Sequence, residues 1–234
     1  MDLTSRRLSS RVLPLFLTEE NRILTGLLLF GSTAFLYVAT NHYQLMPPQF
    51  LPMTWVDYAI PFLPQTVWLY ISEYFFFAMI YLSVKDLALL NRYFYSLFSL
   101  QTLSVLIFLI WPTTYPRDLF PLPESLDKMT YLAFSSLRQT DTPANCCPSL
   151  HVSATLLTAL LYRDDQQNKN SWKMRGVWIW ASLICASTLT TKQHYLADLL
   201  AGAALSVVVF WFFHRIIPYP GAEPKKQITQ NVRQ

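Results

Sequence analysis

Apolar residues in this chain of 234 are gathered into long blocks that contain few or no charges. A helix that crosses a bilayer needs about 20 mostly apolar residues, so blocks of this kind predict membrane-spanning helices. Only 14% of the residues are charged, against roughly 25% in an ordinary soluble domain, which favours the same interpretation. Five blocks fit this description: residues 23–39, 66–84, 93–112, 177–191 and 195–217.

A sixth apolar run, residues 150–162, has only 13 residues, which is short for a span. The distribution of Lys and Arg indicates whether it crosses, because these residues resist translocation and concentrate in cytoplasmic loops. With six spans, the two termini and the second and fourth loops hold 14 of the 18 Lys and Arg residues, and the alternate loops hold 4. We therefore predict six spanning helices with both termini in the cytoplasm.

The pattern as a whole predicts an all-α integral membrane protein built on one six-helix bundle. Its expected parts are a cytoplasmic N-terminal segment (1–22), a membrane catalytic domain (23–217) and a cytoplasmic tail (218–234). The expected location is a bacterial inner membrane, with the active site on the extracytoplasmic side. The formal net charge of +4 serves mainly as an orientation signal, so we expect membrane lipids and no nucleic acid as partners. The sequence predicts no oligomeric state.

Candidate catalytic residues fall in the segments that this topology places outside. Pro148, Ser149 and His151 stand at the start of the fourth helix. Pro148 suits a first-turn position, because its missing N–H costs nothing there. Free N–H groups at a helix start favour an anion. Ser149 and His151 are therefore expected where a phosphate is held.

A second cluster lies between the fifth and sixth predicted helices. His194 and Asp198 are four residues apart, which predicts that both lie on one helix face. A carboxylate one turn from a histidine accepts its ring N–H and leaves the other ring nitrogen as a nucleophile or base. We expect His194 to attack phosphorus and a protonated His151 to give a proton to the departing oxygen. Arg117 and Lys192 would neutralise the phosphate oxygens.

These residues resemble the motifs of the type 2 phosphatidic acid phosphatase (PAP2) superfamily, which also contains lipid phosphotransferases and vanadium haloperoxidases. The resemblance covers residues 117–202 and rests on two motifs, Pro148-Ser149-x-His151 and Ser187 followed by His194-x-x-x-Asp198. It implies that His194 becomes phosphorylated, that His151 is the general acid and that Asp198 orients the nucleophile. Ser149 and Ser187 then join Arg117 and Lys192 as phosphate-binding residues. No metal or other cofactor is expected.

Two features depart from the family's pattern. Thr188 follows Ser187 where the family has Arg, so Lys192 is the nearest cation, a point charge without the planar guanidinium fork. The family's first motif, a Lys seven residues before an Arg-Pro pair, is missing around Arg117. These departures resemble the branch that includes inositol phosphorylceramide and sphingomyelin synthases, in which His-Tyr-x-x-Asp appears as it does at residues 194–198.

The expected function is hydrolysis of a phosphomonoester or pyrophosphate of a lipid through a phosphohistidine intermediate. A lipid phosphotransferase, which passes a phospho-head group to an alcohol, is the alternative. Two further possibilities stay open: a zinc enzyme with His151, His194 and Asp198 as ligands, and a membrane scaffold with a decayed site. Glu73, an acid within the second predicted helix, would contact substrate or a cation, or form a structural hydrogen bond to a neighbouring helix.

Overall fold

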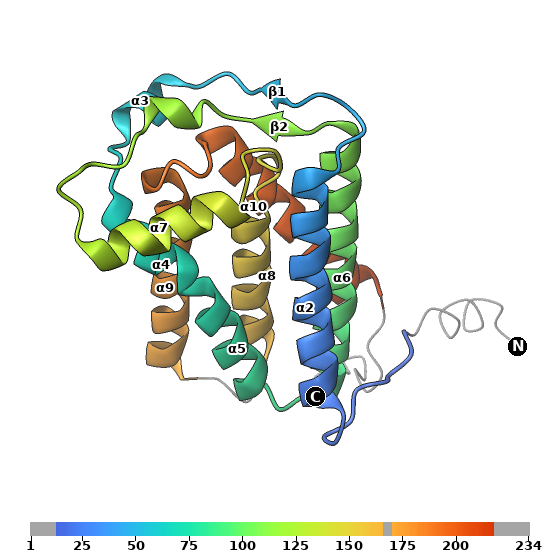
Figure 1. Ribbon diagram of the computed structural model, residues 1–234. Coiled ribbons are helices and arrows are strands. Elements are labelled where there is room, and N and C mark those ends of the chain that lie inside the picture. The colour runs from blue at the N-terminus through green and yellow to red at the C-terminus, as the bar shows by residue number, and fades with distance from the viewer. Residues whose placement is uncertain (1–12, 166–169, 218–234) are drawn as a thin grey trace, which may run out of the picture.

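The computed structural model describes residues 13–165 and 170–217. The predicted tail and residues 1–12 of the predicted N-terminal segment lie outside the described residues. All six predicted helices are present, and together they form the bundle in Figure 1, which confirms the all-α class. They are α2 (Arg22–His42), α4 (Val67–Ile71) continued by α5 (Glu73–Ser83), α6 (Leu87–Ile110), α8 (Leu150–Asp164), α9 (Ser171–Thr190) and α10 (Leu196–Trp211), which runs on into η3 (Phe212–Ile216).

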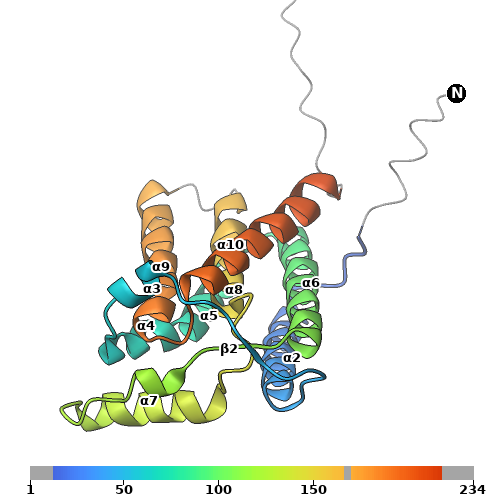
Figure 2. The same cartoon turned by 90° about the horizontal axis from the view of Figure 1, so that it is seen from above.

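Within the described residues, four segments are long and apolar enough to cross a membrane: Arg22–His42, Pro64–Ser83, Leu87–Ile110 and Leu196–His214. The remaining two helices of the bundle fall short on these criteria. α8 has 15 residues, and α9 begins with a polar turn that contains Lys173 and Arg175. Both helices lie alongside the four apolar ones in the same bundle (Figures 1 and 2).

The position of α8 explains how such a short apolar run takes part in a membrane bundle. α8 packs against α5, α6, α9 and α10, and Figure 2 shows it in the middle of the bundle. Most of its side chains are buried. Because protein and not lipid surrounds this helix, it does not need the long apolar exterior of a lipid-facing span.

The second predicted helix is broken at Ser72, which separates α4 from α5. The Ser72 hydroxyl donates to the carbonyl of Leu69 at 2.6 Å, a back-bond that often bends a helix. The same oxygen accepts the indole N–H of Trp180 from α9 at 2.9 Å. The break places Glu73 in the first turn of α5, where it is buried.

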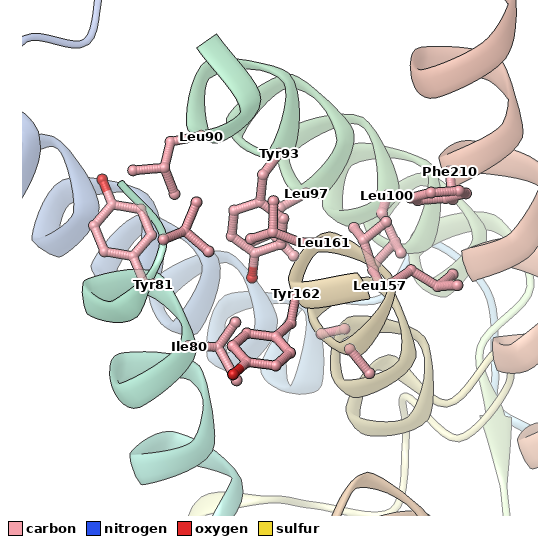
Figure 3. Packing of buried hydrophobic residues seen from close by; sticks show 14 of the residues in the cluster. Ile80, Tyr81, Leu90, Tyr93, Leu97, Leu100, Leu157, Leu161, Tyr162 and Phe210 are labelled. Carbon is pink, nitrogen blue, oxygen red and sulfur yellow. The ribbon is translucent and has the colours of Figure 1, made fainter. Parts of the chain in front are cut away.

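The bundle is held together by a packed cluster in which α6 meets α8 (Figure 3). Tyr93 and Leu97 of α6 and Leu157 and Leu161 of α8 are each at most 1% exposed. The Tyr93 hydroxyl lies 2.7 Å from that of Thr158, so the buried polar groups satisfy each other. Helices in a membrane associate through such close packing and interhelical hydrogen bonds.

The segments that join the helices at one end of the bundle form a cap, which lies at the top of Figure 1. Its elements are β1 (Gln49–Phe50), α3 (Trp55–Ala59), η1 (Pro64–Thr66), β2 (Thr113–Thr114), η2 (Arg117–Leu119) and α7 (Lys128–Thr140). β1 and β2 pair in parallel, with Gln49 opposite Thr113. Neither this short sheet nor α7 was predicted from the sequence.

The opposite end of the bundle carries the connections that were predicted to be basic and cytoplasmic. Arg22 at the start of α2 donates to the carbonyl of Val84, just after α5. Arg92 near the start of α6 donates to the carbonyl of Ile217, just after η3. The helix ends therefore alternate between the two ends of the bundle as six spans require, whereas the side of the membrane that each end faces stays a prediction.

Candidate active site

His151 lies in the first turn of α8, at the end of the helix nearer the cap. Ser149 is the N-cap residue, and its Oγ accepts the Val152 N–H at 3.4 Å, which satisfies one free donor of the helix start. The Ser149 side chain is fully buried. Pro148 therefore precedes the cap, and its predicted place in the first turn is wrong because the helix begins only after Ser149.

His194 lies on the turn between α9 and α10, just outside the helix. α10 begins at Leu196, and its N-cap residue Tyr195 donates its N–H to Asp198 Oδ2 at 2.9 Å. A carboxylate at the third helical position that binds the N-cap backbone fixes the start of a helix. The prediction that His194 and Asp198 share one helix face is therefore wrong, because this cap leaves His194 one residue before the N-cap.

The turn still brings the two side chains together. Asp198 Oδ2 lies 3.4 Å from His194 Nδ1. His194 is 3% exposed and Asp198 is fully buried. Among the described residues, neither ring nitrogen of His194 has a hydrogen-bond partner. A buried polar group without a partner costs about 1–3 kcal/mol. One nitrogen thus faces the carboxylate, and the other is free to meet a ligand.

The rings of His151 and His194 lie side by side, with their centroids 5.8 Å apart and their planes at 59°. Backbone contacts between the starts of α8 and α10 hold them there: the Ser149 N–H donates to the carbonyl of Asp198 at 3.1 Å. Gly202 permits this approach, since a Cβ on it would lie 2.5 Å from the Ser149 carbonyl oxygen. The three predicted catalytic side chains are therefore in one place.

Glu73 forms the bond to a neighbouring helix that the sequence left as one possibility, and its partner is His151. Glu73 Oε1 is hydrogen-bonded to His151 Nδ1. A second acid, Asp141, lies 3.9 Å from the other ring nitrogen, Nε2. The hydroxyl of Tyr37 donates to Asp141 at 2.7 Å, and that of Tyr70 does so at 3.4 Å. With Nδ1 bonded to Glu73, Nε2 is the nitrogen that can meet a ligand.

Arg117 joins the cap to the His194 turn. Its guanidinium donates to the carbonyls of Arg138 and Asp141, at 2.7 and 2.6 Å. It also donates to the Tyr115 hydroxyl at 2.9 Å and to Gln193 Oε1 at 3.3 Å. These acceptors place Arg117 close to the site but bonded to protein groups, so its predicted role as a phosphate ligand stays a prediction.

Lys192 holds the His194 turn onto α3. Its Nζ donates to the carbonyls of Asp57 and Ile60 at 2.5 and 2.6 Å. In return, Asp57 Oδ1 accepts the Leu196 N–H at 2.7 Å. We call this pair of contacts the Lys192–Asp57 brace. The backbone of Lys192 has φ 54°, a left-handed conformation that a lysine rarely adopts unless its surroundings impose it.

One contact of the brace, from the Leu196 N–H to Oδ1, uses the carboxylate of Asp57. Burial raises the pKa of this carboxyl, but hydrogen bonds from Thr54 and from the Leu196 N–H, together with the Lys192 charge, lower the pKa below its usual value. Two of the three N–H donors of Lys192 are already bonded to carbonyls. The structure thus gives Lys192 a structural partner, and its predicted role as a phosphate ligand stays a prediction.

Ser187 and Thr188 lie near the end of α9 and bond back to their own helix. The Ser187 hydroxyl donates to the carbonyl of Ile184 at 2.6 Å, and that of Thr188 donates to the carbonyl of Cys185 at 2.7 Å. The Thr188 carbonyl accepts the His194 N–H at 3.0 Å, which supports the turn. These contacts do not test phosphate binding by the Ser187 hydroxyl, so that role stays a prediction.

A largely apolar cavity of about 490 Å³ borders His151. α2, α4, α5, α7 and α8 line it, and its described lining contains Glu73 and Asp141 but no Lys or Arg. The volume falls in the usual range of small-molecule sites. His151 thus borders an apolar space whose described carboxylates, Glu73 and Asp141, both lie beside its ring.

The zinc alternative required His151, His194 and Asp198 to surround one ion. Within residues 13–165 and 170–217, no group of three or more His, Cys, Asp or Glu side chains is arranged to hold a metal ion. His151 Nδ1 is bonded to Glu73 instead. The described side chains therefore give no support to a zinc site.

Comparison with known proteins identifies the family. A search of curated proteins finds no match to this chain. The family model described as the PAP2 superfamily matches residues 54–212, more than half of the chain. The match runs from the cap residue Thr54 to the end of α10, so it includes both histidines and Asp198. The chain belongs to the PAP2 superfamily, whose members are generally phosphatases.

Proposed function

We propose that this protein is a membrane phosphatase that hydrolyses the phosphate ester of a lipid through a phosphohistidine intermediate. The observation that carries the proposal is the pair of neighbouring histidines, His151 in the first turn of α8 and His194 on the turn before α10. The rings of His151 and His194 lie 5.8 Å apart. The described part of the chain provides no hydrogen-bond partner for either ring nitrogen of His194. A phosphate between the two rings is within reach of both.

In the first step, His194 Nε2 attacks phosphorus and forms a phosphorus–nitrogen bond, while the bond from phosphorus to the lipid oxygen breaks. His151 Nε2 donates its proton to the departing oxygen, which leaves as the lipid alcohol. Asp198 Oδ2, 3.4 Å from His194 Nδ1, stabilises the positive charge that develops on the His194 ring.

In the second step, water attacks the phosphorus atom and gives a proton to His151 Nε2. The phosphorus–nitrogen bond breaks, inorganic phosphate leaves, and His194 regains its lone pair. One water molecule is consumed for each ester cleaved, and both histidines return to their starting protonation states. The cycle therefore needs no oxidant, reductant or further co-reactant.

Glu73 suits His151 to both steps. A carboxylate bonded to Nδ1 stabilises the protonated ring and keeps the exchangeable proton of catalysis on Nε2. The first N–H groups of α8, which carry the partial positive charge of a helix start, are the groups that we assign to the phosphate oxygens. We also assign Arg117 to the phosphate oxygens. When the substrate binds, the guanidinium would exchange one of its protein acceptors for an oxygen of the phosphate.

A lipid substrate agrees with the position of the site. The histidines lie toward the cap end of a bundle that contains four membrane-span-like helices. The opposite end carries the predicted cytoplasmic connections, so we assign the cap to the extracytoplasmic side. The site then lies near the level of the lipid head groups on that side.

The test is the release of inorganic phosphate by the purified protein in detergent. The substrate panel contains phosphatidic acid, a lysolipid phosphate, a polyprenyl pyrophosphate and a sphingoid phosphate. We expect activity that vanadate inhibits and EDTA does not, with His42→Ala as an active control on an exposed residue. Loss of activity with EDTA that zinc restores, or no turnover of any lipid phosphate, would overturn the proposal.

A phosphotransferase is the second candidate, and Thr188 favours it. This residue stands where the phosphatase motif has an arginine, and its hydroxyl is bonded within α9. In that reaction an alcohol replaces water in the second step, so the product is a phosphodiester. A substrate labelled in its head group distinguishes the two, because hydrolysis gives label in water and transfer gives label in a new lipid.

A further inference from the structure

Side chains of α2 and α5 contact each other toward the end of the bundle away from the cap. Phe30 of α2 stacks on Phe77 of α5, with ring centroids 5.8 Å apart and planes within 10°. One turn further from the cap, Gly26 lies against Tyr81, since a Cβ on Gly26 would come within 2.7 Å of that ring. These contacts close the space between the two helices at this end.

Between that closure and the cap, the 490 Å³ cavity occupies the space between the same helices. α2, α5 and α7 provide its sides and α8 provides its back, through residues that include Thr33, Ala34, Tyr74, Leu137 and Ala154. Ala34 and Tyr74 are also exposed on the outer surface. The cavity therefore opens sideways, toward the region that lipid occupies around the bundle.

The charged residues of the cavity lie at its cap end, where Glu73 and Asp141 meet His151. The remainder of the cavity extends along α2 from Tyr37 to Phe30, a distance of roughly 10 Å at the rise of an α-helix. This is about a third of the thickness of the hydrocarbon core of a bilayer. The cavity thus runs from the site into the depth at which acyl chains lie.

We propose that this cavity binds one hydrocarbon chain of the substrate lipid, whose phosphate then lies beside His151; the inference rests on the proposed function. A chain matches the apolar walls, and a head group does not, because the described lining offers an anion no lysine or arginine. The lateral opening lets the chain enter from the membrane without leaving hydrocarbon. Ala34 is a small, exposed residue of α2 that lines the cavity, so a larger side chain there would narrow the opening.

The test compares two substrates and two variants. Ala34→Phe places a ring in the opening, and Ser32→Phe places the same ring on an exposed position of α2 that does not line the cavity. We expect Ala34→Phe to lower kcat/KM for dioleoyl phosphatidic acid by about tenfold or more, while hydrolysis of p-nitrophenyl phosphate stays unchanged. Ser32→Phe should leave both unchanged. Equal losses on the two substrates, or the same loss in both variants, would overturn the inference.

If no lipid phosphate is hydrolysed, the proposed function fails, but binding of a chain in the cavity can still be tested by a second measurement. A phosphatidic acid with a photoreactive group in its chain is irradiated with the wild-type protein, and labelled peptides are sequenced. We expect label on residues 33–38 of α2 and 71–77 of α4 and α5, and less label in Ala34→Phe. Label confined to other outer faces of the bundle would exclude the chain site.

Discussion

The two histidines of the site are held in opposite ways. The ring of His151 is fixed, because it belongs to a helix and its Nδ1 is bonded to Glu73. The ring of His194 lacks hydrogen-bond partners among the described residues, but its turn is fixed by the Lys192–Asp57 brace and by the N-cap of α10. One side chain is therefore held directly and the other through its backbone.

This difference matches the two roles in phosphoryl transfer. A nucleophile needs an unshared lone pair at a defined position, which a rigid backbone and an unpaired ring nitrogen provide. A general acid needs a stabilised proton, which an adjacent carboxylate provides. The environments thus support the proposed roles of His194 as the nucleophile and His151 as the acid, and each prediction below tests one of these two roles.

The largest effect is expected for His194→Ala. Without the attacking nitrogen, kcat for a lipid phosphate should fall by at least about a thousandfold. The catalytic residues act together, so loss of the nucleophile alone removes most of the rate enhancement. Phosphate release by the purified variant measures this, with His42→Ala as the control. Activity within tenfold of wild type would remove His194 from the mechanism.

The next effect concerns His151→Ala and depends on the leaving group. A general acid contributes about 10²–10⁴-fold when the departing oxygen needs a proton. We expect a loss of that size in kcat/KM for an alkyl phosphate and a much smaller loss in kcat/KM for p-nitrophenyl phosphate, whose leaving group needs little assistance. kcat/KM is the quantity to compare, because it reports the step in which the leaving group departs and not the later water step. Losses of equal size on both substrates would contradict the assignment of His151 as the acid.

The carboxylate partners of the two histidines should differ in the same assay, in how the loss of activity depends on the leaving group. Asp198→Asn and Glu73→Gln are each expected to lower kcat by about 10–100-fold, a loss of the size seen when a metal-binding histidine loses the group that orients it. The Glu73→Gln loss should grow with poorer leaving groups, because Glu73 acts through the acid, whereas the Asp198→Asn loss should not. The opposite pattern would exchange the roles of the two histidines.

The Lys192–Asp57 brace predicts a smaller effect with a distinct signature. Lys192→Met should lower kcat by about tenfold while KM and inhibition by vanadate stay close to wild type, since the turn loosens but no phosphate contact is lost. Lys192→Arg, which keeps the charge and donors, should recover part of kcat. A large rise in KM with weaker vanadate inhibition would show that Lys192 binds phosphate directly.

The smallest effect is on stability and concerns the contact that brings the histidines together. Gly202→Ala adds a Cβ that would lie 2.5 Å from the Ser149 carbonyl, so α8 and α10 must shift. Overpacking of this kind costs about 1–3 kcal/mol, read as a lower melting temperature in detergent. Gly31→Ala on α2 is the matched control, because its Cβ meets open space. Equal melting temperatures for the two variants would show that the contact is not tight.

The predictable part of the fold came from composition and charge. Long apolar blocks and the Lys and Arg distribution predicted the six helices, including the short α8, whose burial among other helices explains its length. α7 was missed because its apolar residues are too few for a span, although Asp127 at its N-cap is a local start signal. Capping at Thr54 and Asp57, which starts α3, was a similar signal.

The sequence predicted which motif residues come together in the site. It did not predict the bonds that those residues form with distant parts of the chain. His151, His194 and Asp198 come together as expected, but the N-cap of α10 leaves His194 outside the helix. The bonds of Lys192 to α3 span more than 130 residues of sequence, and those of His151 to Glu73 span 78. Spacing along the chain carries no signal for such pairs.

The most direct test of this account is to locate the phosphoryl group on the enzyme. His151→Ala, which should slow the water step, is incubated briefly with p-nitrophenyl phosphate labelled in its phosphate, because this leaving group departs without help from the acid. The protein is then denatured in alkali, which preserves phosphohistidine. We expect the label on the peptide that contains His194, and no label when His194→Ala is added to the same variant. Label on another residue, or label that survives the loss of His194, would contradict the account.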